Sequence, residues 1–273
     1  MALEGGVAIV TGAGGGIGSA IARRLGAEGM SLVLADRSRS GLDAAADSVD
    51  RPVDIMTVVG DVGDPSHHAA LVAAAEDLGG LALSVQNAGV YLPGLSWEIP
   101  IEDWELQFRV NYWGVVHGVR AALGIMTRRN AGHLIATASG AGLVATPALA
   151  PYVSSKHAVV GLMETVRHEL ARVAPGVRAS VVCPGNVRTP MAANSLAAAG
   201  IGEEHLSPVA RTVADAVRAG NDAGADPSTV ADALVDAVHS GAFWVLPQPE
   251  LAFAVTDRAQ RIADGREPVD LLG

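Results

Sequence analysis

Short apolar runs alternate along the chain with longer stretches whose apolar residues recur at helical spacing. The apolar runs, which we predict to be strands, are residues 7–10, 31–35, 56–59, 81–85, 133–137, 178–183 and 243–246. The predicted helices lie near residues 17–28, 39–49, 66–78, 103–129, 153–173 and 227–239. Alternation at this spacing implies right-handed strand–helix–strand crossovers. The pattern therefore predicts a doubly wound α/β domain, with a mostly parallel sheet and helices on both of its faces.

Residues 190–226 break this alternation. They contain Pro190, Gly220 and Gly224 around alanine-rich segments and show no strand pattern. Because long irregular insertions in compact domains usually serve a function, we predict a mobile lid over a substrate site. A helical excursion without a gating role is the alternative. The length of 273 residues fits one large α/β domain, so we expect residues 1–273 to form a single domain that includes this lid.

Composition narrows the classes of function. Hydrophobic residues make up 49% of the chain and charged residues 18%, which allows a sizeable core and excludes global disorder. The net charge of −10 disfavours contact with a phosphate backbone, so we expect no nucleic-acid partner. The N-terminus does not have the pattern of a secretory signal, and no apolar run approaches the ~18 residues that span a bilayer. We therefore expect a cytoplasmic protein without membrane contact.

The sequence offers little for a metal ion. Its one cysteine, Cys183, excludes an internal disulfide framework and a site of several cysteines, and we expect a buried thiol at a strand end. His67 and His68 are adjacent, so on a helix their side chains point about 100° apart. We expect both histidines to face solvent, and we expect no bound metal.

A glycine-rich turn follows the first predicted strand. The run VAIVTGAGGGIG leads into a segment with helical spacing of Ile17 and Ile21, so Gly12, Gly16 and Gly18 lie between a strand and a helix N-terminus. A pyrophosphate is stabilised there by free backbone N–H groups and by the helix dipole. Glycine lets the turn close and the ligand approach. A merely flexible turn would contain glycines too, but this one has the strand–turn–helix context of a dinucleotide site.

An acidic residue ends the second predicted strand. Asp36 stands 18 positions after Gly18, where a carboxylate accepts hydrogen bonds from the adenosine ribose hydroxyls. It would also repel a 2′-phosphate, by roughly 4 kcal/mol for unit charges about 4 Å apart at an effective dielectric of 20. Arg37 acts in the opposite direction, because it can pair with that phosphate. We therefore expect NAD as the cofactor, with NADP the less favoured alternative.

Three side chains are candidates for proton transfer. Tyr152 and Lys156 are four positions apart on a predicted helix and so lie on one face, although such a pair also arises by chance. Free tyrosine has a pKa near 10, and a lysine charge about 5–6 Å away would lower it by roughly two units. Ser139 ends the predicted strand 133–137, at the edge where α/β sheets bind ligands. Its hydroxyl is placed to hold a substrate oxygen beside Tyr152.

Together these residues resemble the short-chain dehydrogenase/reductase family, in its ordinary-length, single-domain branch, over nearly the whole chain. The family's glycine signature is met by Thr11-Gly12 and Gly16-Ile17-Gly18. The resemblance implies a catalytic tetrad of Asn111, Ser139, Tyr152 and Lys156. It implies that Asp61 and Val62 contact the adenine of the cofactor, and that Pro184, Gly185, Val187 and Thr189 position the nicotinamide carboxamide. It implies further cofactor contacts at Asn87, Ala88 and Gly89. Gln86 stands where the family usually has a first asparagine, and we expect a local adjustment in strand packing.

The resemblance also implies a Rossmann fold and a division of roles. Lys156 would bind the nicotinamide ribose and lower the pKa of Tyr152, which would exchange a proton with the substrate oxygen. Ser139 would stabilise that oxygen, and Asn111 would hold a water that connects Lys156 to solvent. The family implies a homotetramer or homodimer, associated through helices 103–129 and 153–173.

The expected function is hydride transfer between NAD(P)(H) and a secondary alcohol or ketone. Residues 140–151 carry no charge, and we expect them to line a largely apolar substrate pocket with residues 91–93, Met191 and Leu196. The alternative is that these side chains pack against protein. Two other functions remain open: an NAD(H)-binding regulatory protein without turnover, and a related lyase, epimerase or dehydratase.

Overall fold

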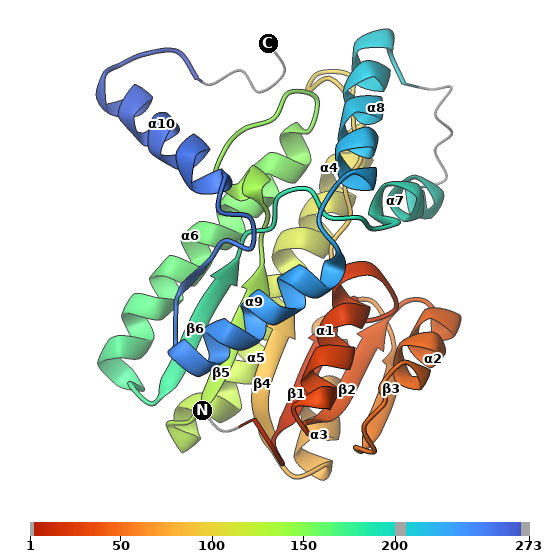
Figure 1. Cartoon of the computed structure of the whole chain (residues 1–273), viewed down its shortest axis with the longest axis vertical. Coiled ribbons are helices and arrows are strands. Elements are labelled where there is room, and N and C mark those ends of the chain that lie inside the picture. The colour runs from red at the N-terminus through yellow and green to blue at the C-terminus, as the bar shows by residue number, and fades with distance from the viewer. Residues whose placement is uncertain (1–2, 200–205, 269–273) are drawn as a thin grey trace.

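A computed structural model describes residues 3–199 and 206–268 of the chain. Its centre is a seven-stranded parallel sheet with the order β3-β2-β1-β4-β5-β6-β7 (Figure 1). The strands are β1 (Val7–Thr11), β2 (Ser31–Asp36), β3 (Ile55–Val59), β4 (Leu81–Gln86), β5 (Gly132–Thr137), β6 (Val177–Val182) and β7 (Trp244–Val245). All seven strands predicted from the sequence are present.

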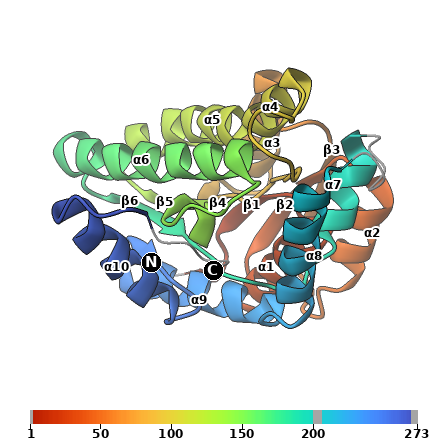
Figure 2. The same ribbon diagram turned by 90° about the horizontal axis from the view of Figure 1, so that it is seen from above.

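Helices cover both faces of the sheet, as Figure 2 shows from above. One face carries α1 (Gly16–Ala27), α2 (Arg39–Asp47) and α9 (Pro227–Ser240). The other carries α3 (Pro65–Asp77), α4 (Ile101–Phe108), α5 (Gly114–Arg129) and α6 (Ala150–Val173). The doubly wound arrangement predicted from the sequence is confirmed.

The apolar runs form strands because successive residues feed two separate cores. In β1 all five residues are buried; Ala8 and Val10 belong to the core under α1 and α9, and Val7 and Ile9 to the core under α3, α5 and α6. Side chains in a strand alternate between faces, so a strand buried on both sides reads as a continuous apolar run.

The chain reverses its direction of travel across the sheet between β1 and β4. From β1 it winds outward to β2 and β3, and it then returns to β4 and continues to β7 on the other side. The loops that follow β1 and β4 consequently leave the sheet in different directions. Open α/β sheets bind ligands in the crevice expected at such a point, which we call the cofactor crevice. The glycine-rich turn and the segment after β4 border this crevice.

The segment 190–226 is largely helical where the structure describes it. It contains α7 (Met191–Ala199) and α8 (Pro208–Asp222), which lie beyond the carboxyl edge of the sheet (Figure 1). The start of α8 carries local signals, because Ser207 caps the helix by accepting from Ala210 N and Pro208 occupies its first turn. Residues 200–205 of the expected lid lie outside the described residues. Motion of these helices stays a prediction.

Three local features differ from the expectation. The long helix expected over residues 103–129 is divided by a π-helical turn, Arg109–Trp113, between α4 and α5. A helix not expected from the sequence, α10 (Leu251–Ala263), follows β7.

The expectation that His67 and His68 face solvent is wrong, because α3 packs against α5 and both side chains are buried. Burial lowers the pKa of each.

A third histidine, His133 in β5, is fully buried away from the crevice. Its Nε2 lies 2.7 Å from Ser180 Oγ, and the Ser180 hydroxyl donates to Ala242 O at 2.6 Å. His133 Nε2 is therefore the protonated nitrogen, while the buried Nδ1 finds no hydrogen-bond partner among the described residues. Burial lowers the pKa of His133 to about 4.

This burial predicts acid sensitivity of the fold. The unfolded chain binds a proton at His133 below pH ~6.5, whereas the folded chain does so only near pH 4, so the stability falls as the pH drops through this window. The expected contribution is about 2 kcal/mol of unfolding free energy lost between pH 7.5 and pH 5. Urea denaturation of the wild type and of His133→Gln at both pH values measures it. If His133→Gln lost as much unfolding free energy between the two pH values as the wild type does, His133 would not be the group responsible.

Candidate active site

Tyr152 and Lys156 converge near the start of α6, as their spacing predicts. Lys156 Nζ lies 5.7 Å from the centroid of the Tyr152 ring. The lysine side chain is only 2% exposed, and its ammonium donates to Thr137 O at 2.9 Å. This carbonyl belongs to the last residue of β5, so α6 is tied to the carboxyl edge of the sheet at the point where the phenol is presented.

Ser139 follows β5 and completes the group. Its side chain is hydrogen-bonded to Tyr152, and its Oγ also accepts from Ala141 N at 3.1 Å. The carbonyl of Pro184, in the segment after β6, accepts from Gly140 N at 2.7 Å and so holds the Ser139 loop against that segment. The phenol, the ammonium and the serine hydroxyl therefore meet at one edge of the sheet.

Asn111 lies in the π-helical turn and is fully buried. Its Nδ2 donates to Val90 O at 2.8 Å and to Ser155 Oγ at 3.1 Å, and its Oδ1 accepts from Val90 N at 2.8 Å. The side chain thus joins the segment after β4 to α6. These contacts use both protons of Asn111 Nδ2. The expected role of Asn111 in holding a water stays a prediction.

Burial dominates the electrostatics of the group. Burial raises the pKa of Tyr152, although the hydrogen bond with Ser139 lowers it in part. Burial also lowers the pKa of Lys156 to about 8. The sequence predicted a lowered pKa for Tyr152, and in the structure burial outweighs the neighbouring groups. Tyrosinate formation at neutral pH therefore needs a positive charge in addition to those of the protein.

Tyr91 is a second buried phenol, which the sequence indicated only as part of a pocket wall. Its ring centroid lies 5.8 Å from that of Tyr152 in an edge-to-face arrangement. Burial, and then the neighbouring Tyr152, raise the pKa of Tyr91 to about 12. Its backbone N donates to Ser195 Oγ at 3.1 Å, so α7 is attached close to Tyr152.

Cys183 is fully buried just after β6, as predicted. Burial raises the pKa of its thiol to about 12, and Lys156 acts in the opposite direction. Among the described residues, no group of three or more histidine, cysteine or acidic side chains is placed to hold a metal ion. In the same part of the chain, no helix has the length and apolar character needed to cross a membrane.

The glycine-rich turn has little room for side chains at Gly12, Gly16 and Gly18. Gly12 has φ +67°, and a Cβ on it would come within 2.8 Å of Ala88 Cα; a Cβ on Gly18 would lie 2.0 Å from Gly12 O. Gly16 has φ +52° and faces the side chain of Thr189. No side chain among the described residues caps the N-terminus of α1. This glycine cradle, with its open N–H groups, is able to hold a pyrophosphate.

Asp36 stands beside this cradle at the end of β2. Its Oδ2 accepts from Gly14 N at 3.0 Å and its Oδ1 from Ser38 N at 2.9 Å. A carboxylate oxygen has two acceptor sites, so each oxygen retains capacity for a ribose hydroxyl. Arg37 contributes positive potential at Asp61, on the side of the crevice toward β3. Ile17 packs into the core below α1.

Asp61 and Val62 follow β3. Asp61 forms an ion pair with Arg109 and accepts from Gly63 N at 2.8 Å. Burial raises the pKa of Asp61, but the hydrogen bonds from Arg109 and Gly63 lower it overall. Val62 is 8% exposed and packs against Gly114, where a Cβ would come within 2.9 Å of its side chain.

The segment after β4 is bonded to the end of β1. Asn87 Nδ2 donates to Thr11 O at 3.1 Å, and the backbone N atoms of Asn87 and Ala88 donate to Thr11 Oγ1 at 2.9 and 3.2 Å. Gly89 follows directly; a Cβ there would lie 3.4 Å from Lys156 Nζ. These bonds place the Asn87–Gly89 segment between the glycine turn and the catalytic lysine.

The segment after β6 closes the same crevice. Gly185 N donates to Gln248 Oε1 at 2.9 Å, and Gln248 Nε2 returns a bond to Asn186 O at 3.2 Å. Val187 is buried and pairs with Ala225 in an isolated bridge. The sequence did not indicate Gln248, since its role depends on the loop after β7 folding back. The structure thus brings most of the predicted site residues to the carboxyl edge of the sheet, whereas the side chain of Ile17 packs against the core.

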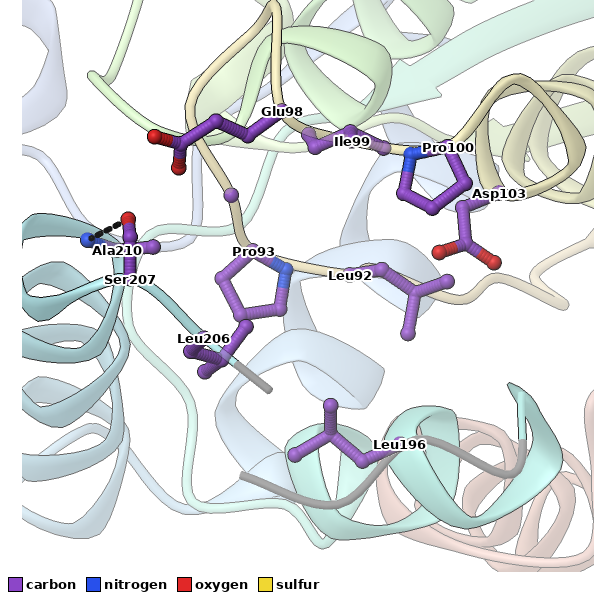
Figure 3. A pocket seen from close by; sticks show the side chains of 11 residues that line it. Leu92, Pro93, Glu98, Ile99, Pro100, Asp103, Leu196, Leu206, Ser207 and Ala210 are labelled. Atoms are coloured by element: carbon purple, nitrogen blue, oxygen red, sulfur yellow. Dashed lines mark hydrogen bonds between the residues drawn. The ribbon is translucent and has the colours of Figure 1, made fainter. Parts of the chain in front are cut away.

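A cavity of about 320 Å³ lies between the loop after β4 and helices α7 and α8 (Figure 3). Leu92, Pro93 and Leu196 line it, as the sequence predicted. Tyr91, Met191 and residues 140–151 are not among the described residues that line it. The remaining lining residues are Gly94, Glu98, Ile99, Pro100, Asp103, Leu206, Ser207 and Ala210. The wall is thus largely apolar, with two carboxyl groups that the sequence analysis did not place there.

Comparisons with known proteins agree with this geometry. Residues 6–200 match the sequence profile described as short chain dehydrogenase. The chain is 36% identical to 1-deoxy-11-beta-hydroxypentalenate dehydrogenase of Streptomyces avermitilis, over 70% of this chain and 72% of that protein. It is also 36% identical to D-beta-hydroxybutyrate dehydrogenase of Rhizobium meliloti, over 67% of this chain and 72% of that protein. A crystal structure of a short chain dehydrogenase/reductase from Burkholderia phymatum in complex with NAD matches with a TM-score of 0.93, at 33% identity over 100% and 99% of the chains.

The structure explains how Gln86 is accommodated. The side chain is buried, its Nε2 donates to Ser84 Oγ at 2.9 Å, and it fills the space over Gly118 of α5, where a Cβ would lie 2.0 Å from Gln86 Oε1. The longer amide therefore depends on a glycine in the facing helix.

Gly118→Ala should consequently destabilise the wild-type fold by about 1–3 kcal/mol, because overpacking outweighs the gain in helix propensity. The shorter side chain of Gln86→Asn should relieve the clash, so that the double variant is more stable than Gly118→Ala alone. Chemical denaturation of the four proteins measures this coupling. Additive effects of the two substitutions would show that Gln86 does not depend on Gly118.

Proposed function

The chain belongs to the short-chain dehydrogenase/reductase family, and from this premise we propose that it transfers a hydride between NAD and a largely apolar secondary alcohol or ketone, with Tyr152 as the general acid and base. Family membership makes the protein an NAD(P)-dependent oxidoreductase acting on CH–OH groups of small molecules. The observation that carries the finer proposal is the convergence of Tyr152, Lys156 and Ser139 beside the glycine turn.

Asp36 supports NAD as the preferred cofactor. Its carboxylate stands at the end of β2, held against the glycine turn by Gly14 N, where the adenosine ribose of a bound dinucleotide would lie. A 2′-phosphate at that ribose would meet a fixed negative charge. The related structure from Burkholderia phymatum is a complex with NAD, which is consistent with this choice.

In the proposed mechanism the protein orients the substrate and moves the proton. NAD, when bound, would supply the hydride acceptor and, in its oxidised form, a positive charge. Tyr152 takes the alcohol proton in oxidation and returns it in reduction. Ser139 holds the reacting oxygen next to that phenol, and Lys156, fixed by Thr137 O, holds the nicotinamide ribose. Asn111 fixes the position of α6 through Ser155.

The substrate proposal rests on the cavity in Figure 3. In that view Leu92, Pro93, Leu196 and Leu206 gather around its centre, so an apolar body would be desolvated there. Glu98 and Asp103 also line it, and they disfavour a substrate with a negative charge. Burial raises the pKa of Asp103, and the negative charge of Glu102 raises it further. A neutral ketone or secondary alcohol fits this lining best.

We also propose a homotetramer or a homodimer, with α5 and α6 as the associating helices. Trp113, next to the start of α5, supports an interface there because its side chain is 51% exposed. Large aromatic side chains with this exposure are common at protein interfaces.

The raised pKa of Tyr152 predicts the pH dependence of the reaction. Alcohol oxidation needs the deprotonated phenol, so kcat for oxidation should rise about tenfold per pH unit on the acid side of the Tyr152 pKa in the complex. Ketone reduction needs the protonated phenol and should be flat over the same range. Initial rates at the reduced-nicotinamide absorbance band, measured in both directions from pH 6 to pH 10, check this.

Tyr152→Phe is the matching control. It should bind NAD as the wild type does and lose at least about a thousandfold in kcat, because the proton-transfer group alone is removed. NAD binding by both proteins is measured by calorimetry. Near-normal turnover in the variant would remove Tyr152 from the mechanism, and NAD binding without turnover in the wild type would favour a regulatory function.

The two carboxyl groups of the cavity predict a charge preference. Glu98→Gln and Asp103→Asn should each raise kcat/KM for a ketone with a carboxylate on its side chain by about three- to tenfold, because a repulsion is removed. Activity toward a neutral ketone of the same shape should stay within about twofold. Glu105→Gln is the control, because Glu105 is an exposed residue on α4, the helix that carries Asp103. Equal effects on both ketones would place the substrate outside this cavity.

A further inference from the structure

The turn after β3 is held in place by the π-helical turn Arg109–Trp113. The guanidinium of Arg109 binds Asp61 Oδ2, while the other carboxylate oxygen accepts from Gly63 N at 2.8 Å. The stem of Arg109 lies over Gly63, where a Cβ would come within 2.8 Å of Arg109 Cγ. The arginine is therefore packed against the turn as well as paired with it. This arrangement fixes the direction of the Asp61 carboxylate.

The neighbouring residue is fixed from two other directions. His68 Nε2 donates to Val62 O at 2.9 Å, and the side chain of Val62 lies against Gly114 at the start of α5. A carbonyl oxygen only accepts, so the bonded nitrogen of His68 is the protonated one. Backbone and side chain of this turn are thus held by α3, by the π-helical turn and by α5.

The same π-helical turn carries Asn111. Arg109 reaches the turn after β3, and Asn111, two residues later, reaches Val90 and Ser155. One short element therefore fixes both the far end of the cofactor crevice and the catalytic end. A regular α-helix through residues 109–113 would rotate one of these side chains away from its partner, because each residue adds about 100°.

The family resemblance implies that Asp61 contacts adenine. We propose that Arg109 is a positioning residue for this contact, and that its ion pair directs the Asp61 carboxylate toward the exocyclic amino group of the base. This inference rests on the proposed function, since it requires the dinucleotide to bind along the crevice. The ion pair leaves acceptor capacity on both Asp61 oxygens, because each oxygen offers two sites and has one protein partner. Arg109 contributes orientation, and Asp61 makes the contact.

The chain contains a closely matched control. Arg129, at the other end of α5, forms an ion pair with Glu76 of α3, and the side-chain exposures are 47% and 27%, against 46% and 33% for Arg109 and Asp61. The two ion pairs lie at opposite ends of the layer that contains α3 and α5. Arg129→Met therefore removes an equivalent surface interaction at a distance from the crevice.

The test measures dinucleotide binding by calorimetry in the full-length wild type, Arg109→Met and Arg129→Met. Arg109→Met should weaken NAD binding about tenfold, the loss expected for one charge-assisted hydrogen bond. Arg129→Met should change it less than twofold. At saturating NAD, kcat of Arg109→Met should stay within about threefold of the wild type, because the reacting end of the cofactor is untouched. Arg109→Lys, which keeps a cation, should be intermediate.

A second dinucleotide isolates the amino group. Nicotinamide hypoxanthine dinucleotide carries a carbonyl where adenine has its amino group, so the wild type should bind it about tenfold more weakly than NAD. Arg109→Met should bind the two dinucleotides about equally. An equal loss for both dinucleotides in Arg109→Met would overturn the proposal, because it would indicate a general distortion of the turn.

Two further results would overturn it. Unchanged NAD affinity in Arg109→Met would show that Asp61 needs no orientation, and tighter binding would show that Arg109 competes with adenine for the carboxylate. If the wild type bound neither dinucleotide, the proposed function itself would fail. Should Arg109→Met not fold, Arg109→Lys supports the same comparison, because a displaced cation shifts Asp61 without emptying the site.

Discussion

The structure of the site depends on a buried positive charge. Lys156 is almost completely enclosed, and an ammonium in such a place is tolerated only where a polar partner replaces water. Thr137 O, at the last residue of β5, is that partner. A small residue is needed beside the contact, because a Cβ on Gly142 would come within 2.8 Å of the Lys156 carbonyl oxygen. The bond therefore determines how closely α6 approaches the sheet, and with it where the phenol of Tyr152 stands.

Around this contact, the sheet joins segments that are distant in the sequence. Thr11, at the end of β1, accepts bonds from the segment after β4, and the Pro184 carbonyl after β6 accepts one from the loop after β5. Hydrogen bonds thus connect the loops that follow neighbouring strands of the sheet. The parallel order explains why, since all carboxyl ends lie at one edge. The proposed cofactor and substrate residues sit on loops, but the bonds between those loops make the site rigid.

Much of this could be predicted from the sequence. The strands were evident because a strand buried on both faces is a continuous apolar run, and the glycine turn because its strand–turn–helix context is local. Other features depend on tertiary packing. The π-helical turn has neither proline nor glycine within Arg109–Trp113, so nothing in the helical pattern marks it. His68 looks like a surface residue until α5 covers it and Val62 offers a carbonyl. Gln248 reaches the site only because the chain folds back after β7.

The single thiol, which interacts electrostatically with Lys156, determines how the protein reacts with oxidants and alkylating reagents. Only the thiolate reacts readily with peroxides or electrophiles, and with a pKa of about 12 Cys183 is ionised in roughly one molecule in a hundred thousand at pH 7. It is also completely covered. Because Cys183 is the one cysteine of the sequence, the folded protein offers no reactive thiol to such reagents at neutral pH.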